Sequence, residues 1–312
     1  MAGASVYVTP PALARFPEHG DPLEYSSRSL LFAQDGDRVL RAWGRPARPW
    51  VIAVEPAGER WKVDGSIDDP PAWRRAVRTL FSFHHPLERF YALVRSDPVL
   101  RGTERRFRGL RLPRDASVYE SLLHSIVSQQ ISLAAAESLR RRLHDRTEAY
   151  VRWGRWELPC VPLPSRVRSL GEPGLVALGL SRAKARALVA LAERERRASL
   201  DDPSLAVGPL PPAVQRLDGL FGVGRWTAEN ALLRGVGRRD VFVAGDVGVR
   251  VALARYGSIP REAPEADARA WALSRYPTWG SYATLYLWRR LTSDRRRPAG
   301  SGGARCAALP AG

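Results

Sequence analysis

Three glycines fall within six positions of the sequence, at Gly219, Gly222 and Gly224, and they constrain the fold more than any other stretch. Residues 211–217 open with two prolines and predict a short helix, and the apolar spacing of residues 225–233 predicts a second one. Glycines permit a tight turn with open main-chain amides, and amides at the start of a helix bind phosphate whatever the base. An ordinary corner between two helices is the alternative. A dinucleotide-binding loop is disfavoured because it should follow a strand.

A carboxylate, Asp246, follows this turn 20 residues after Trp226. It directly precedes residues 247–256, which predict a helix, so one interpretation is a helix N-cap, a position that aspartate favours. The other interpretation is chemical, because a carboxylate beside a phosphate-binding turn can stabilise positive charge that develops during a reaction. The two roles can coexist in one side chain.

Residues 222–228 together with Asp246 resemble the helix-hairpin-helix DNA glycosylases of base-excision repair, the HhH-GPD superfamily. The strongest resemblance is to the alkylbase, or 3-methyladenine, DNA glycosylase II type. Such an enzyme extrudes a damaged base from duplex DNA and cleaves its glycosidic bond. Further segments that match this type, in the family's order, are 109–113, 128–132, 179–184 and 281–288.

The expected fold class is α+β, with a small antiparallel β-sheet in an N-terminal domain, residues 1–97. An all-α helix-hairpin-helix domain is expected over residues 98–291, and the aperiodic residues 292–312 predict a disordered tail. Residues 34–37 contain a glycine and predict a hairpin turn between two strands. The expected strands are 6–9, 29–33, 38–42, 50–54 and 61–63, followed by a helix that opens at Pro70.

The resemblance implies a role for individual residues. Asp246 takes the place of the catalytic aspartate. Trp226 stands where strand-cutting relatives carry a lysine that forms a Schiff base, which implies a monofunctional enzyme that leaves an abasic site. Gln130 or Ile131 takes the place of the wedge that fills the gap left by the extruded nucleotide. The remaining residues of the base pocket would be Trp279, Tyr282 and Asn230, and the remaining DNA contacts Gly222, Gly224, Arg225, Thr227 and Arg250.

No cofactor is expected to be required, although the resemblance implies a monovalent cation, Na or K, at the glycine turn. Its ligands would be the main-chain carbonyls of Asp218, Leu220 and Val223. Only Cys160 and Cys306 are cysteines, so the chain lacks the four thiolates of the iron-sulfur cluster found in some relatives.

The formal net charge is +17 and the isoelectric point is near 11.0, a balance that suits a polyanionic partner. The expected partner is double-stranded DNA with a damaged base, bound by a monomer because one lesion is one site. No apolar run approaches the roughly 20 residues of a membrane helix, and the N-terminus lacks a signal-peptide pattern. A cytoplasmic, nucleoid-associated location is therefore expected.

Two other functions stay open at the level of sequence. One is a glycosylase for oxidised, deaminated or mismatched bases, which Trp226 disfavours. The other is a non-catalytic helix-hairpin-helix DNA-binding protein, which the presence of Asp246 at the family's spacing disfavours. For the favoured function, electron-rich rings such as Trp226 would stack on cationic purines of the 3-methyladenine and 7-methylguanine class.

Overall fold

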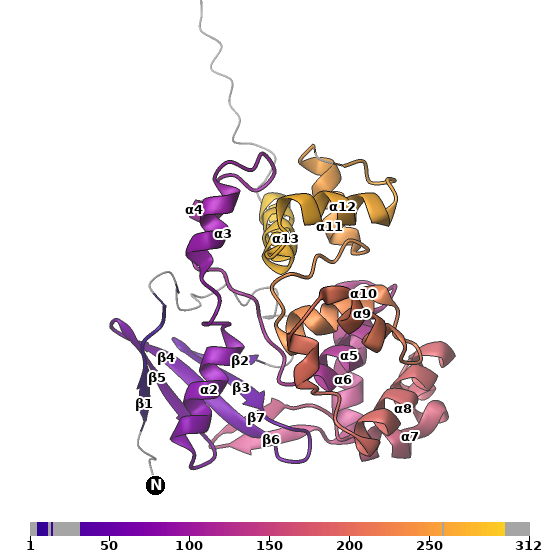
Figure 1. The fold of residues 1–312 in the computed structure, drawn as a ribbon. Helices are drawn as coiled ribbons and strands as arrows, with labels where there is room; N and C mark the ends of the chain where they lie inside the picture. Colours follow the sequence, from indigo (N-terminus) through magenta and orange to yellow (C-terminus); the bar gives the residue numbers. More distant parts are fainter. Residues whose placement is uncertain (1–4, 12–13, 15–31, 258, 297–312) are drawn as a thin grey trace, which may run out of the picture.

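The computed structural model describes residues 5–11, 14, 32–257 and 259–296 (Figure 1). An antiparallel sheet near the N-terminus is followed by a larger helical part, so the predicted α+β class is confirmed. No helix in the described part of the chain is both long and apolar enough to cross a membrane.

The N-terminal sheet has five strands in the order β1-β5-β4-β3-β2, and each neighbouring pair is antiparallel. The predicted turn between the second and third strands is confirmed, with Gly36 at φ +58°. Residues 29–31 of the expected second strand lie outside the described residues. The strands are β1 (Val6–Val8), β2 (Phe32–Asp35), β3 (Arg38–Trp43), β4 (Trp50–Ala57) and β5 (Arg60–Gly65).

One face of the sheet is buried against helix α2 (Pro70–Leu80), and the opposite face is buried over β3 and β4, because the side chains alternate between two apolar clusters. On β4, Ile52 faces α2, whereas Val51 belongs to the cluster on the opposite face. That second face is covered by a two-stranded hairpin, β6 (Tyr150–Trp153) and β7 (Trp156–Pro159), as Figure 1 shows. This hairpin is an addition to the expected architecture, because the second part of the chain is helical apart from it.

The helical part is built around one large apolar core. Two of its helices begin at a serine N-cap, a residue type that this position favours: Ser117 Oγ accepts a hydrogen bond from Glu120 N at 3.0 Å, and Ser181 Oγ accepts from Lys184 N at 3.3 Å. The helices are α3 (Leu87–Val94), α4 (Thr103–Arg106), α5 (Val118–Ser128), α6 (Leu133–Thr147), α7 (Pro164–Ala177), α8 (Arg182–Arg197), η1 (Pro203–Ala206), α9 (Leu210–Asp218), α10 (Arg225–Ala231), η2 (Leu232–Val236), α11 (Val247–Arg255), α12 (Glu265–Arg275) and α13 (Gly280–Arg296).

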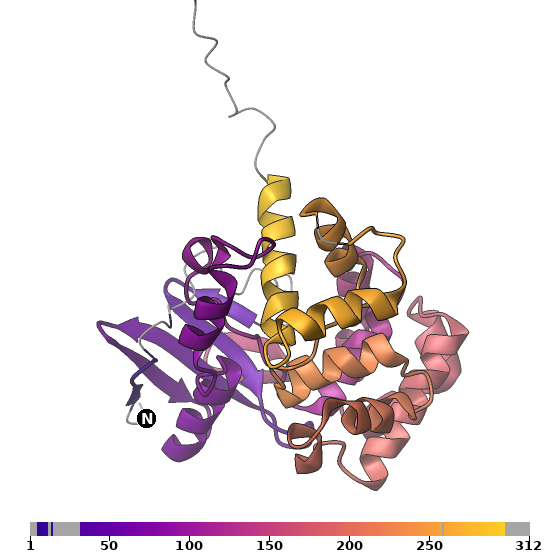
Figure 2. The same cartoon turned by 45° about the horizontal axis from the view of Figure 1, so that its top comes forward.

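The last helix, α13, lies between α3 and α11 (Figure 2). It extends past residue 292, where the disordered tail was expected to start. Helix α13 continues to Arg296, so residues 292–296 are helical, and the rest of the predicted tail, 297–312, lies outside the described residues. Asp294 explains the extension, because its carboxylate pairs with Arg106 at 2.6 Å and accepts from Tyr256 Oη at 2.9 Å. Helix α3 also packs into the helical core, although the expected first domain extended to residue 97.

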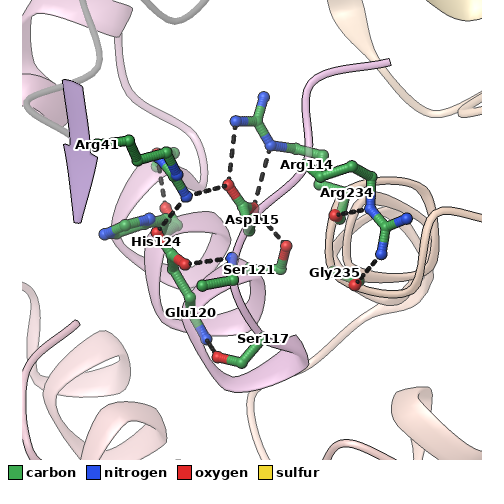
Figure 3. Close-up of polar contacts among 11 residues, drawn as sticks. Arg41, Arg114, Asp115, Ser117, Glu120, Ser121, His124, Arg234 and Gly235 are labelled. Carbon is green, nitrogen blue, oxygen red and sulfur yellow. Dashed lines mark hydrogen bonds and ion pairs between the residues drawn. The ribbon is translucent and has the colours of Figure 1, made fainter. Parts of the chain in front are cut away.

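A buried network of charges joins the sheet to the helical part (Figure 3). Arg41 on β3 lies 2.9 Å from Glu120 on α5 and 3.8 Å from Asp115, and each of the three side chains is at most 2% exposed. Burial raises the pKa of Glu120 to about 7, although Arg41 opposes it. Burial also acts to raise the pKa of Asp115, but the charges of Arg234 and Arg41 outweigh it and hold that pKa well below its ordinary value. The docking of the two parts thus depends on paired charges inside the protein.

Candidate active site

The glycine turn joins α9 to α10 and makes a helix-hairpin-helix. Gly222 has φ +77°, and a Cβ there would lie 2.3 Å from Ala187 Cβ on α8, so glycine is needed for both its backbone and its lack of a side chain. Gly222 and Gly224 are exposed. Their amides donate to no acceptor in the described part of the chain, as an anion-binding turn requires.

Asp246 lies at the N-terminus of α11, where both interpretations of the sequence can hold together. Its Oδ1 accepts a hydrogen bond from Val249 N at 3.0 Å, so the predicted N-cap is confirmed. The carboxylate is only part-buried, and Oδ1 also accepts from Trp288 Nε1 at 2.7 Å. Its Oδ2 accepts from Trp226 Nε1 at 3.2 Å. Both carboxylate oxygens of Asp246 therefore accept hydrogen bonds, and the bond from Trp226 keeps the carboxylate beside the hairpin.

The predicted pocket residues fall into two groups. Trp226 contacts Asp246, and Asn230 lies one turn further along α10 with its side-chain amide donating to Trp226 O at 2.9 Å. Trp279 and Tyr282 instead lie in an aromatic cluster, with ring centroids 5.4 Å apart. Tyr282 is 0% exposed and Trp279 6% exposed, so Tyr282 offers no surface to a base in this conformation.

The tyrosine is held in the interior by His85, whose Nδ1 lies 3.0 Å from Tyr282 Oη. Burial lowers the pKa of His85 to about 3, with the positive charges of His84 and nearby arginines acting in the same direction. His85 is therefore neutral near pH 7, and we interpret this pair as part of the core rather than as acid-base machinery.

The predicted wedge residues lie on the short loop between α5 and α6. Gln130 is exposed and adopts φ +54°, and Ile131 is 38% exposed. The sequence assigns no individual role to the neighbouring Gln129. In the structure its Nε2 donates to Gly222 O at 3.1 Å and to Thr227 Oγ1 at 3.0 Å. The wedge loop is thus fastened to the hairpin by one amide side chain.

The predicted DNA contacts differ in their surroundings. Thr227 is 1% exposed and accepts the bond from Gln129. Arg225 is exposed and lies 3.1 Å from Glu229. Arg250 donates instead to the carbonyls of the loop between α11 and α12, at positions 261 and 263. The structure therefore gives Arg250 a role in holding that loop.

Glu229 is a second residue that sequence reasoning missed. It is buried on α10 and pairs with Arg269 on α12, which also donates to Phe242 O at 3.4 Å. Burial raises the pKa of Glu229, while Arg269 and Arg225 oppose that rise. The bridge joins the hairpin helix to the segment that leads to Asp246. The sequence signal that could have revealed it is the spacing of Arg225 and Glu229, an arginine and a glutamate four positions apart on one helix.

The expected cation ligands lie where α9 ends and the turn begins. The carbonyl of Leu220 accepts from Val223 N at 3.0 Å, and the carbonyl end of α9 carries partial negative charge. Within the described residues, no group of three or more His, Cys, Asp or Glu side chains is arranged to hold a metal ion.

Comparison with known proteins places this geometry in a family. The model of the HhH-GPD superfamily base excision DNA repair proteins matches residues 123–275, which include the wedge loop, the hairpin and Asp246. The chain belongs to the HhH-GPD superfamily. Helix α13, which supplies Trp288, lies beyond the matched residues of this HhH-GPD protein.

Named relatives of this HhH-GPD chain point to one type. The DNA-3-methyladenine glycosylase of Bacillus subtilis is 26% identical over 233 residues, covering 75% of this chain and 74% of the relative. DNA-3-methyladenine glycosylase 2 of Escherichia coli is 32% identical over 184 residues, covering 58% of this chain and 60% of the relative. Among solved structures, the 3-methyladenine DNA glycosylase from Archaeoglobus fulgidus matches with a TM-score of 0.79 and 26% identity, over 93% of this chain and 98% of that one.

Proposed function

We propose that this HhH-GPD protein is a monofunctional DNA glycosylase that releases alkylated purines, of the 3-methyladenine and 7-methylguanine class, and leaves an abasic site. The observation that carries the proposal is the pairing of Asp246 with Trp226 directly beside the hairpin. The names of the relatives support the same substrate class. The substrate would be duplex DNA with one damaged base, bound by one copy of the chain.

Extrusion of the base comes first. Removing a base from the stack costs a few kcal/mol, and the cost is least for a damaged base. The exposed turn at Gly222 and Gly224 supports a main-chain grip on phosphate near the lesion. Gln130 or Ile131, both on the exposed loop, would fill the gap, and Gln129 keeps that loop at a fixed place relative to the hairpin.

Hydrolysis then follows at the sugar. As the bond from C1′ to the base nitrogen breaks, its electron pair leaves with the base, and positive charge develops on the deoxyribose. The Asp246 carboxylate stabilises that charge and accepts a proton from the water whose oxygen bonds to C1′. An alkylated purine that already carries positive charge leaves as a neutral base, so the site needs no strong general acid.

The lysines support the absence of a strand-cutting step. The chain has two, Lys62 and Lys184. Lys62 Nζ bonds to Glu55 on the N-terminal sheet at 2.7 Å, and Lys184 Nζ donates to Val127 O at the end of α5 at 2.8 Å. Trp226 occupies the position of the attacking lysine and has no nucleophilic amine.

A monovalent cation fits the turn on chemical grounds. Carbonyl oxygens are neutral, hard donors, and the carbonyl end of α9 adds partial negative charge beside Asp218, Leu220 and Val223. The cation, when bound, would add positive charge that attracts a DNA phosphate. The amides of the hairpin supply the rest of that attraction.

One experiment tests the function. Wild type and Asp246→Asn are incubated, with enzyme in excess, with duplexes that contain 3-methyladenine, 7-methylguanine, hypoxanthine, ethenoadenine or 8-oxoguanine. We expect wild type to release the methylated purines, and Asp246→Asn to be slower by about 100-fold or more. Release of 8-oxoguanine in preference to methylated bases would show that oxidised purines, not alkylated ones, are the substrate. Equal rates for the two proteins would show that Asp246 does not take part in the reaction. Borohydride should trap no covalent complex with DNA.

A further inference from the structure

One face of α13 holds the segment that carries Asp246. Ser281, Thr284 and Trp288 are three and four positions apart in turn, so they lie on one side of the helix. All three side chains are buried. Each of the hydrogen bonds described below joins one of them to another part of the chain rather than to α13 itself. Their polar atoms are directed at the segment 238–246.

The two hydroxyls of this face bind the main chain. Ser281 Oγ donates to Arg238 O at 2.6 Å and accepts from Val241 N at 3.1 Å. Thr284 Oγ1 accepts from Val243 N at 3.2 Å. Successive contacts along α13 therefore follow successive positions of the segment, so the segment and the helix are held in register.

Trp288 completes the series at the carboxylate itself. Its Nε1 donates to Asp246 Oδ1 at 2.7 Å, and the same oxygen accepts from Val249 N at 3.0 Å. The other oxygen, Oδ2, accepts the single longer bond of 3.2 Å from Trp226 Nε1. A carboxylate oxygen has about two lone-pair positions, so Oδ1 is filled by its two donors and Oδ2 keeps one.

We infer that the Ser281, Thr284 and Trp288 face of α13 is a positioning device for Asp246, with Oδ1 as the anchored oxygen and Oδ2 as the oxygen that meets the reacting sugar and water. This inference rests on the proposed role of Asp246. A charge stabiliser acts best when its position is set before the reaction, because no reorganisation is then needed as charge develops. Trp288 is thus a positioning residue that acts through Asp246.

The test compares variants that each remove one hydrogen-bonding group with little change of shape. Trp288→Phe removes the indole N–H, and Thr284→Val replaces a hydroxyl with a methyl group of similar size. Trp73→Phe is the matched control for the first, since Trp73 is buried and its Nε1 donates to Ile67 O at 3.0 Å, far from Asp246 in the chain. Thr147→Val is the control for the second, because Thr147 is buried and its Oγ1 donates to Leu143 O at 2.7 Å.

Two quantities are measured for each full-length variant: the single-turnover rate of base release from a duplex with 7-methylguanine, and the Kd for a duplex with a stable abasic-site analogue. We expect Trp288→Phe to lower the rate by about 10-fold, the loss of one bond to a charged acceptor, with the Kd unchanged within about 2-fold. Thr284→Val should lower the rate by about 3-fold with the same Kd. The two control variants should keep both values.

In the otherwise wild-type protein, either of two results would overturn the inference: wild-type rates for both α13 variants, or a parallel loss of rate and DNA affinity. A second background separates this inference from the function itself. On Asp246→Asn, whose residual rate is followed over long incubations, Trp288→Phe should have no further effect. An equal fold-loss on both backgrounds would show that Trp288 does not act through Asp246, and so would overturn the inference. Wild-type activity of Asp246→Asn would instead overturn the proposed role of Asp246.

Discussion

Gln129 Nε2 lies 3.0 Å from Thr227 Oγ1, across 98 positions of sequence, and ties the loop after α5 to the first turn of α10. The same amide nitrogen donates to Gly222 O at 3.1 Å. In the proposed function, the loop and the hairpin contact the same distorted duplex. A fixed distance between them would let a phosphate held at the hairpin also position the wedge.

Gln129→Leu keeps the size of the side chain and removes both hydrogen bonds. We expect the single-turnover rate of base release to fall by about 10-fold, because two bonds of roughly 0.5–1.5 kcal/mol each no longer fix the wedge loop. Affinity for undamaged duplex should change little, since the phosphate-binding amides are intact. Gln215→Leu, at an exposed position on α9, is the control and should match wild type. An unchanged rate for Gln129→Leu would show that the link has no part in extrusion.

Gly222→Ala tests the packing of the hairpin. The new Cβ would meet Ala187 Cβ at 2.3 Å, and φ +77° adds backbone strain, so we expect a loss of about 3 kcal/mol in the free energy of unfolding. Gly208→Ala shares the positive φ, +72°, but its Cβ would have nothing within 4 Å, so it should lose only about 1 kcal/mol. Chemical denaturation measures both.

Ala187→Gly supplies the cross-check for this contact. The double variant Ala187→Gly with Gly222→Ala should be more stable than the sum of the single effects by about 1–2 kcal/mol, because the clash disappears while the strain stays. If the changes in the free energy of unfolding of the two single variants simply add in the double variant, then residues 187 and 222 are not in contact.

Local features of this chain were predictable and long-range ones were not. The N-caps at Ser117, Ser181 and Asp246 depend on a donor three residues away, so the sequence alone reveals them. The bond between Trp288 and Asp246 spans 42 positions and depends on how α13 packs against α11. No spacing rule connects those two residues.

The β6–β7 hairpin shows a different limit. Each strand has four residues, too short for alternation of polar and apolar side chains to stand out from the neighbouring helices. Leu158 and Cys160 are buried because they pack against the face of the N-terminal sheet opposite α2, a contact that the local sequence does not reveal. Likewise, Arg41 has the sequence pattern of a surface residue, and only the docked helix α5 shows why it is buried.

Arg41→Met should destabilise the protein more than an ordinary surface substitution. Methionine fills much of the same volume but leaves Glu120 and Asp115 buried without that partner, which we expect to cost about 3–5 kcal/mol in the free energy of unfolding. Arg38→Met is the control, since its pair with Asp64 is part-exposed and should be worth about 1 kcal/mol or less. Equal losses for the two variants would mean that the buried network adds nothing to docking.

The pH dependence of stability should reveal Glu120. Its pKa is raised to about 7 in the folded protein from an ordinary 4.5, so the folded state holds the proton more tightly than the unfolded state. Its contribution to stability is therefore complete below about pH 4.5 and is lost as the pH rises through about 7. Asp115 has the opposite shift and stays ionised over this range, in which it contributes constant stability.

Buried histidines act in the same range with the opposite sign. Burial lowers the pKa of His124 and takes that of His144 to about 4, so their effect makes the protein more stable as the pH rises toward 6.5. A comparison of wild type with Glu120→Gln cancels this effect, because both proteins keep the histidines. From pH 5 to pH 8, the stability of wild type relative to Glu120→Gln should fall by about 2–3 kcal/mol, measured by urea unfolding at each pH. Parallel curves would show that Glu120 does not take up a proton on folding, and that Arg41 keeps it ionised at every pH in this range.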